Sequence, residues 1–174
     1  WADRPPIEAH GIAIGPCFLR PKSRGTVRLR SANPKDRALF DAGSFRDSDD
    51  LEVLTRGVLK GIEILQAPAL AKLVKRRHLP EPGLERDPDG LRAFVRQSAK
   101  TVFHPVGTAK MGPDTDRMAV VDSELRVRGV TGLRVGDNSI MPTLVSGNTN
   151  APAMMIGERC ARFITGKTKK AAAA

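Results

Sequence analysis

The sequence of 174 residues lacks tyrosine, contains one tryptophan and has only 4% aromatic residues. So few rings argue against a platform on which the bases of single-stranded nucleic acid stack. No run of eighteen apolar residues occurs, so the sequence predicts no transmembrane segment. Apolar residues still make up 40% and charged residues 28%, which is typical of a folded chain of one large or two small domains and not of a disordered one.

Cysteine and histidine are also scarce. Cys17 and Cys160 lie far apart and form no CxxC pattern, so a disulfide framework is not expected and a reducing, cytoplasmic compartment fits. Peripheral association with a membrane is compatible with the same pattern. His10, His78 and His104 share no metal-ligand spacing, so we expect no metal site.

The charge is strongly basic, with 29 Lys and Arg residues against 19 Asp and Glu residues and a net charge of +10. This balance raises one alternative function, a basic module that binds nucleic acid or an acidic partner. The bases are scattered, however, except for one dense run at Lys72, Lys75, Arg76 and Arg77. We therefore favour a solvated basic surface over a nucleic-acid site.

The first hundred residues predict two strands followed by two helices. Residues 11–19 are a short apolar run typical of a strand, residues 26–30 alternate like a half-buried strand, and residues 33–44 are expected to be irregular. Asp49 is a candidate N-cap for a helix whose apolar stripe runs from Leu51 to Leu65.

Glycine and proline add detail to these helices. Gly57 and Gly61 would allow a neighbouring segment to pack closely, and Pro68 should end or kink the first helix. Asp87 is expected to cap the second helix, with Pro88 at its first position. The inner face of this second helix would carry Leu91, Phe94 and Val95, with Val102 as a further candidate.

The remainder predicts short strands at residues 119–121, 125–127 and 133–135, then a helix over residues 151–164. Asn150 is the candidate N-cap of this helix, and Gly166 should follow its C-terminus. The fold class is therefore α+β, with an antiparallel sheet backed by helices.

Three local features could carry chemistry. His104 precedes Pro105 and Gly107 in a rigid turn, which is compatible with a general base but also with a structural histidine. The Gly136-Asp137 pair ends an apolar strand, where it could approach a ligand or simply form a turn. The polar residues 146–152 enter the last helix, where they could bind an anion or only cap the helix.

Taken together, these segments resemble the C-terminal region of the glucose-methanol-choline (GMC) family of FAD-dependent oxidoreductases, with choline dehydrogenase-like members nearest in style. The resemblance is carried by residues 21–31, 104–112, 119–122, 125–130, 132–142 and 146–150. It implies a substrate-binding domain at residues 1–103. It also implies an active-site and FAD-contacting segment at residues 104–166, which would be the C-terminal part of a Rossmann-like FAD domain. Residues 167–174 carry little sequence information and are expected to form a flexible tail.

The resemblance also implies roles for individual residues. His104 matches the active-site histidine, and Asn148 matches the second active-site position. Gly136, Asp137 and Asn138 match a strand end near the FAD phosphates and ribityl chain. Two further residues, Thr149 and Asn150, match positions beside the flavin ring.

The implied reaction is oxidation of a small-molecule alcohol. Hydride would pass from the CH–OH carbon to flavin N5 while His104 acts as the base and Asn148 donates a hydrogen bond to the alkoxide. The positive end of the last helix would stabilise the reduced flavin. Which alcohol is oxidised, and which acceptor receives the electrons, is left open.

The sequence departs from the family pattern in two respects. Ala109 stands where many members have cysteine, and no GxGxxG fingerprint is present. We therefore expect these residues to depend on an N-terminal FAD domain and to be inactive alone. We also expect exposed apolar patches at residues 141–145 and 154–156, or self-association that covers them.

Overall fold

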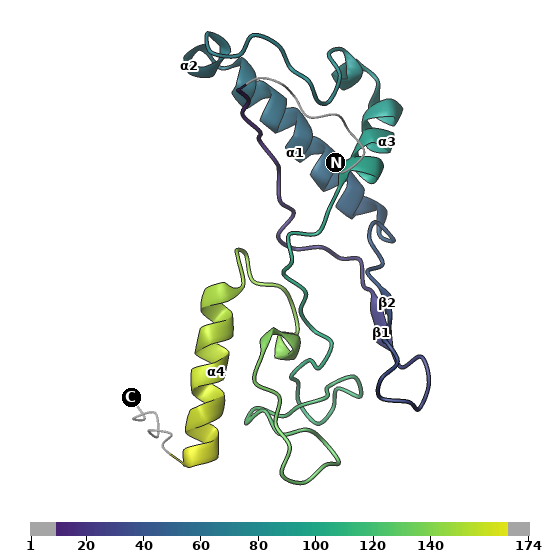
Figure 1. Cartoon of the computed structure of the whole chain (residues 1–174), viewed down its shortest axis with the longest axis vertical. Coiled ribbons are helices and arrows are strands. Elements are labelled where there is room, and N and C mark those ends of the chain that lie inside the picture. Colours follow the sequence, from purple (N-terminus) through teal and green to yellow (C-terminus); the bar gives the residue numbers. More distant parts are fainter. Residues whose placement is uncertain (1–9, 167–174) are drawn as a thin grey trace. The chain divides into compact units, whose positions relative to one another are not determined.

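The computed structural model describes residues 10–166, so the predicted flexible tail at 167–174 lies outside the described residues. The chain divides into two compact units (Figure 1). Within the described residues, the helical unit comprises 10–25 and 40–100, and the C-terminal unit comprises 26–39 and 101–166. The assignment of residues 1–103 to substrate binding and 104–166 to FAD contact stays a prediction.

The helical unit is built on α1 (Ser48–Gln66), and its predicted apolar stripe is confirmed by the burial of Leu51 and Ile62. The predicted N-cap is wrong by two residues, because the Asp47 side chain caps the helix by accepting from the backbone N–H of Asp49 at 2.9 Å. The residue before Pro68 is extended, which ends α1 as predicted and starts the short helix α2 (Pro68–Ala71).

The second predicted helix is α3 (Pro88–Ser98), which follows a 3₁₀ turn, η1 (Leu84–Arg86). Asp87 caps α3 as predicted, accepting from Gly90 N–H at 3.0 Å. Leu91 and Val95 are almost fully buried where α3 packs on α1 (Figure 1). These two helices supply the apolar core of the helical unit.

The strand predicted at residues 11–19 is absent from the structure. The segment is extended but lies against α1, where it has no strand with which to form a ladder. An added Cβ on Gly57 would lie 2.7 Å from Pro16 Cβ, and one on Gly61 would lie 3.4 Å from Ile14 Cγ2. The two glycines therefore permit close packing, as the sequence predicted.

Within residues 10–166 the sheet is a two-stranded hairpin, β1 (Thr26–Arg28) with β2 (Leu39–Asp41). All six residues are exposed, so the prediction of a half-buried strand at 26–30 is wrong. Because β2 falls within residues 33–44, the prediction that this stretch is irregular is wrong in part. The α+β class is confirmed, with a smaller sheet than expected.

The three strands predicted in the C-terminal unit are reduced to isolated bridges. Val121 pairs with Val127 and Arg126 with Arg134, both antiparallel, while Met111 and Val121 form a parallel bridge. Turns at residues 123–124, 128–129 and 131–132 separate these bridged residues. The last helix, α4 (Asn150–Thr165), is confirmed, and Gly166 ends it with a φ of 66°.

One buried cluster holds the C-terminal unit together. Its members come from the bridged loops, from the 3₁₀ turn η2 (Asn138–Ile140) and from α4, and they are Val121, Leu125, Ile140, Met141 and Ile156. The predicted apolar patches are therefore partly wrong, because Met141 and Ile156 belong to this core. Met154 and Met155 on α4 are exposed, as expected. No helix of residues 10–166 is long and apolar enough to span a bilayer.

Candidate active site

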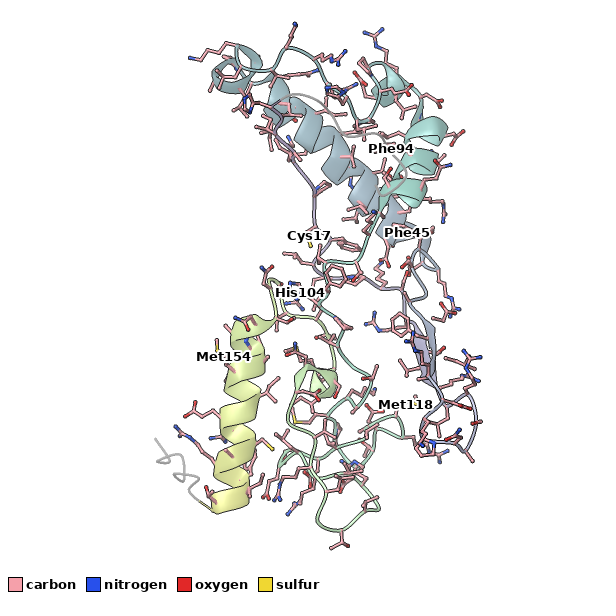
Figure 2. The ribbon with its side chains drawn as sticks, viewed as in Figure 1. Cys17, Phe45, Phe94, His104, Met118 and Met154 are labelled. Atoms are coloured by element: carbon pink, nitrogen blue, oxygen red, sulfur yellow. The ribbon has the colours of Figure 1, made fainter. Side chains whose placement is uncertain are left out.

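His104 lies half-buried in the C-terminal unit, directly after a residue with unusual backbone geometry (Figure 2). Phe103 has a φ of 62°, a left-handed conformation that costs free energy in a bulky residue. Its N–H donates to Thr101 Oγ1 at 3.0 Å. Pro105 restricts the chain on the other side of the histidine. The backbone on both sides of His104 is therefore constrained.

The turn after His104 is attached to η2. Gly107 has a φ of 85°, and a Cβ added there would lie 3.3 Å from the Met141 carbonyl oxygen. Further along, Ala109 N–H donates to the Ser139 carbonyl at 3.0 Å, and Met111 N–H donates to the Ile140 carbonyl at 2.7 Å. These contacts bring the predicted histidine turn and the predicted Asp137–Asn138 segment into one substructure.

The Asp137 carboxylate caps η2 by accepting from Ser139 N–H at 2.7 Å. The hydrogen bond from the Ser139 side chain is the largest effect that holds the pKa of Asp137 below its ordinary value, and the Ser139 backbone N–H adds to it. Burial acts in the opposite direction. Asp137 is therefore a charged acceptor at neutral pH. Next to it, the buried Oδ1 of Asn138 has no hydrogen-bond partner among the described residues.

Gly136, predicted to allow close approach of a ligand, lies against Cys160 of α4. Both cysteines are free thiols, Cys17 exposed and Cys160 half-buried. The role of Gly136 in this structure is thus to let α4 pack closely on the segment that leads into Asp137.

The start of α4 meets His104. Thr149 is 3% exposed, and its Oγ1 lies 2.9 Å from His104 Nδ1, although the two residues are 45 positions apart in the sequence. Thr149 is also the N-cap residue, in place of the predicted Asn150, yet its side chain does not cap the helix. Asn148 and Asn150, on either side of it, are both exposed.

The structure therefore brings some of the predicted site residues into contact, and for others it shows no contact among the described residues. His104 contacts Thr149, whereas the orientation of the Asn148 amide toward an alcohol oxygen stays a prediction. Sequence reasoning missed two contributors, the backbone at Phe103 and the support that Ser139 gives to Asp137. A left-handed phenylalanine has no local sequence signal, whereas the spacing of Asp137 and Ser139 is typical of an Asx turn.

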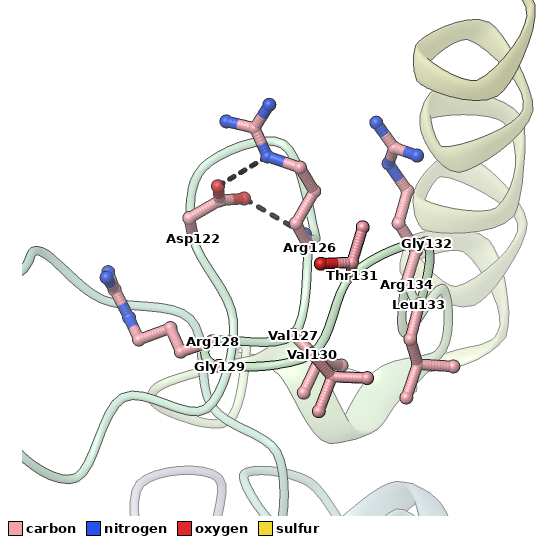
Figure 3. A pocket seen from close by; sticks show the side chains of 10 residues that line it. All are labelled: Asp122, Arg126, Val127, Arg128, Gly129, Val130, Thr131, Gly132, Leu133 and Arg134. Atoms are coloured by element: carbon pink, nitrogen blue, oxygen red, sulfur yellow. Dashed lines mark hydrogen bonds and ion pairs between the residues drawn. The ribbon is translucent and has the colours of Figure 1, made fainter.

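A surface hollow elsewhere in the C-terminal unit is separate from this site (Figure 3). Its arginines are already engaged. Arg126 pairs with Asp122 at 2.8 Å, Arg128 donates to the Gly112 carbonyl at 2.7 Å, and Arg134 donates to the Glu124 carbonyl at 3.1 Å. None of the predicted site residues lines this hollow.

Comparisons with known proteins give the family of this α+β chain. The family model described as GMC oxidoreductase matches residues 21–157. The chain belongs to the GMC oxidoreductase family, as the sequence resemblance predicted.

Named relatives agree with this assignment. The chain is 44% identical to the alcohol dehydrogenase [acceptor] of Pseudomonas putida over 93% of its own length, and 44% identical to the choline oxidase of Arthrobacter globiformis over 91%. An FAD-dependent oxidoreductase from Chaetomium thermophilum superposes with a TM-score of 0.79 at 36% identity, covering 86% of this chain and 26% of that structure. The chain spans 29% of the length of each of the two curated relatives.

Proposed function

We propose that this chain forms the substrate-contacting and flavin-contacting C-terminal part of an FAD-dependent enzyme that oxidises a small alcohol. Family membership supports the reaction class. The observation that carries the proposal is the contact between His104 and Thr149, because it brings the candidate base to the 148–150 segment at the start of α4.

The two active-site residues have complementary tasks in this proposal. His104 takes the proton of the substrate hydroxyl. The Asn148 amide, which is exposed and free to face a ligand, donates a hydrogen bond to the oxygen as negative charge develops on it. FAD, when bound, would supply the two-electron acceptor that takes hydride from the carbinol carbon. The products are then a carbonyl compound and reduced cofactor.

The described residues fit such a cofactor. Asn138 Oδ1 is a buried acceptor with no partner in the part of the chain that the structure describes, which suits a ribityl hydroxyl. The charged carboxylate of Asp137 would also accept from a hydroxyl and would repel a phosphate. The first turn of α4 has no side-chain cap, so its N–H groups and the positive end of the helix dipole can face an electron-rich ring beside Thr149 and Asn150.

The nucleotide part of FAD requires residues beyond these. The chain has no GxGxxG fingerprint and spans 29% of its curated relatives. We therefore propose that a separate FAD-binding portion completes the enzyme and that this chain alone does not turn over. The exposed Met154 and Met155 would lie toward that portion, and self-association of the isolated chain is expected to cover them.

The basic-module alternative has less support. Arg77, from the dense basic run, has little exposed side chain and pairs with Glu85 at 2.5 Å. It also donates to the Pro80 carbonyl at 2.8 Å and to the Glu81 carbonyl at 3.1 Å. The Arg77 guanidinium therefore binds groups of the helical unit itself. Steep salt dependence of binding to DNA would favour the alternative.

The test is turnover of the FAD-loaded enzyme with His104→Gln, using choline and simple primary alcohols with a dye acceptor and with oxygen. We expect kcat to fall by about two to four orders of magnitude while the flavin absorption spectrum is retained. His78→Gln is the control, since His78 is exposed in the helical unit. Turnover of His104→Gln close to that of the control would overturn the proposal.

A further inference from the structure

The side chain of Thr149 has an unusual hydrogen-bond partner for an N-cap residue. A threonine at an N-cap position ordinarily accepts a hydrogen bond from an N–H in the first turn of its helix. Thr149 does not do so, and its buried hydroxyl instead lies 2.9 Å from His104 Nδ1. A capping bond has been replaced by a contact with the candidate base, which points to a task beyond starting the helix.

The contact falls on the ring nitrogen that decides the tautomer. Neutral imidazole carries one proton, so a lone pair on Nε2 requires the proton to be on Nδ1. A hydroxyl that accepts from Nδ1–H stabilises this tautomer. A hydroxyl that donates to Nδ1 stabilises the other one, in which Nε2 already bears hydrogen and cannot take a proton.

We propose that Thr149 is a positioning residue that accepts a hydrogen bond from His104 Nδ1–H and thereby keeps Nε2 free to take the proton of the alcohol. This inference rests on the proposed role of His104 as the base. After proton transfer both ring nitrogens bear hydrogen, and the same Thr149 oxygen still accepts from Nδ1. The contact therefore serves the reactant and the product state without rearrangement.

Both partners are fixed by the backbone, as such a device requires. Thr149 is held at the start of α4, where its carbonyl accepts from Ala153 N–H at 2.9 Å. His104 follows the left-handed Phe103, whose N–H is bonded to Thr101 Oγ1. A hydroxyl on a helix start and an imidazole on a constrained turn can keep one geometry through the reaction.

The direct test is NMR of the ring nitrogens in the full chain, by long-range ¹H–¹⁵N correlation at a pH high enough for the histidine rings to be neutral. We expect His104 to have a protonated Nδ1 and an unprotonated Nε2. The exposed His10 and His78 serve as internal references for an unrestrained ring. Thr149→Val should move His104 to the tautomer mixture of these references, and Thr149→Ser should restore it. Protonated Nε2 in the wild type, or no change in Thr149→Val, would overturn the inference.

The kinetic test separates this inference from the proposed function. In the FAD-loaded enzyme, Thr149→Val should lower kcat by about tenfold to a hundredfold with little change in KM, by analogy with the loss of a group that orients a metal-bound histidine. Thr149→Ser should recover most of it, and Thr131→Val, at an exposed threonine, is the matched control. Full activity of His104→Gln would defeat the proposed function. Loss of activity in His104→Gln with normal kcat in Thr149→Val would defeat only the role of Thr149.

Discussion

Gly136 lies so close to Cys160 of α4 that a Cβ atom at position 136 would be 2.8 Å from the cysteine Sγ and 2.9 Å from its Cβ. Real Cβ atoms do not approach other heavy atoms this closely, so any side chain at 136 must displace α4. Because α4 begins at the candidate active site, this packing contact and the position of Thr149 beside His104 are linked through one helix.

The first prediction follows from that contact. Gly136→Ala should lower the free energy of unfolding by about 1–3 kcal/mol through overpacking, measured by urea denaturation of the full chain. Adding Cys160→Ala should recover part of the loss, because it removes the Sγ clash and leaves the Cβ clash. Gly157→Ala is the control on the same helix, since a Cβ there meets no neighbour within 4 Å. It should be neutral or stabilising by up to about 1 kcal/mol. Equal effects at the two glycines would contradict the packing argument.

The sequence predicted those features whose cause is local. Asp87 and Pro88 define the start of α3 by contacts within four residues, and the structure agrees. The start of α1 was placed two residues late, because several aspartates there can cap and the choice depends on what else they bind. The carboxylate of Asp50, for example, accepts hydrogen bonds from the backbone N–H groups of residues 22 and 23. Capping patterns therefore predict the presence of a helix start reliably, but they predict the exact first residue less well.

Features that depend on distant partners were not predictable in the same way. The apolar run at 11–19 has strand composition, but it packs on Gly57 and Gly61 of a helix, so no strand forms. The family resemblance predicted site roles for His104 and Thr149 separately. Their direct contact over 45 positions has no signal in spacing or composition and required coordinates.

The second prediction concerns pH. Asp50 is 2% exposed and accepts from Lys22 N–H and Ser23 N–H, each at 2.8 Å. Burial opposes its ionisation, but hydrogen bonds from Ser23 and Lys22 outweigh burial and hold the pKa of Asp50 below its ordinary value of 3.8. The carboxyl of Asp50 binds a proton more readily in the unfolded chain than in the folded one. Its contribution to the free energy of unfolding is therefore fully present at pH values above that ordinary pKa. The contribution is lost as the pH falls through the lower folded-state pKa.

The corresponding experiment compares urea denaturation of the full chain with that of Asp50→Asn across the acid range. At neutral pH the variant should be less stable by about 1–3 kcal/mol, because two part-buried N–H groups lose a charged acceptor. The difference should shrink as the pH falls below about 4. Asp89→Asn is the matched control, as the Asp89 side chain is 97% exposed. A difference that is constant over the whole pH range would rule out ionised Asp50 as its source.

The third prediction tests the left-handed backbone before His104. Phe103 has a φ of 62° and is 82% exposed, so its side chain contributes little burial to offset the conformational cost. Glycine adopts this conformation freely, whereas alanine is penalised by roughly 1–2 kcal/mol. Phe103→Gly should therefore be more stable than Phe103→Ala by about 1 kcal/mol, the reverse of the order expected at ordinary positions. Thermal denaturation of the two variants measures the order directly, and alanine above glycine would show that position 103 is not held in this geometry.

The fourth prediction concerns Asn148 as the hydrogen-bond donor to the reacting oxygen. In the FAD-loaded enzyme, Asn148→Ala should reduce kcat by about two to three orders of magnitude, the typical effect of removing one donor from a developing oxyanion. Asn148→Asp should be at least as impaired, because a carboxylate cannot donate and its charge repels the alkoxide. Asn148→His keeps an N–H donor and should retain more activity than either.

The comparison requires that the flavin spectrum and the substrate KM remain near wild type, so that lost turnover reflects the reacting oxygen and not lost cofactor. Gln97→Ala removes an equally exposed amide from the helical unit and should turn over normally. If Asn148→Ala matched Gln97→Ala in kcat, the donor would have to come from another group. His104 would then be the base of a site in which a group other than the Asn148 amide donates to the reacting oxygen.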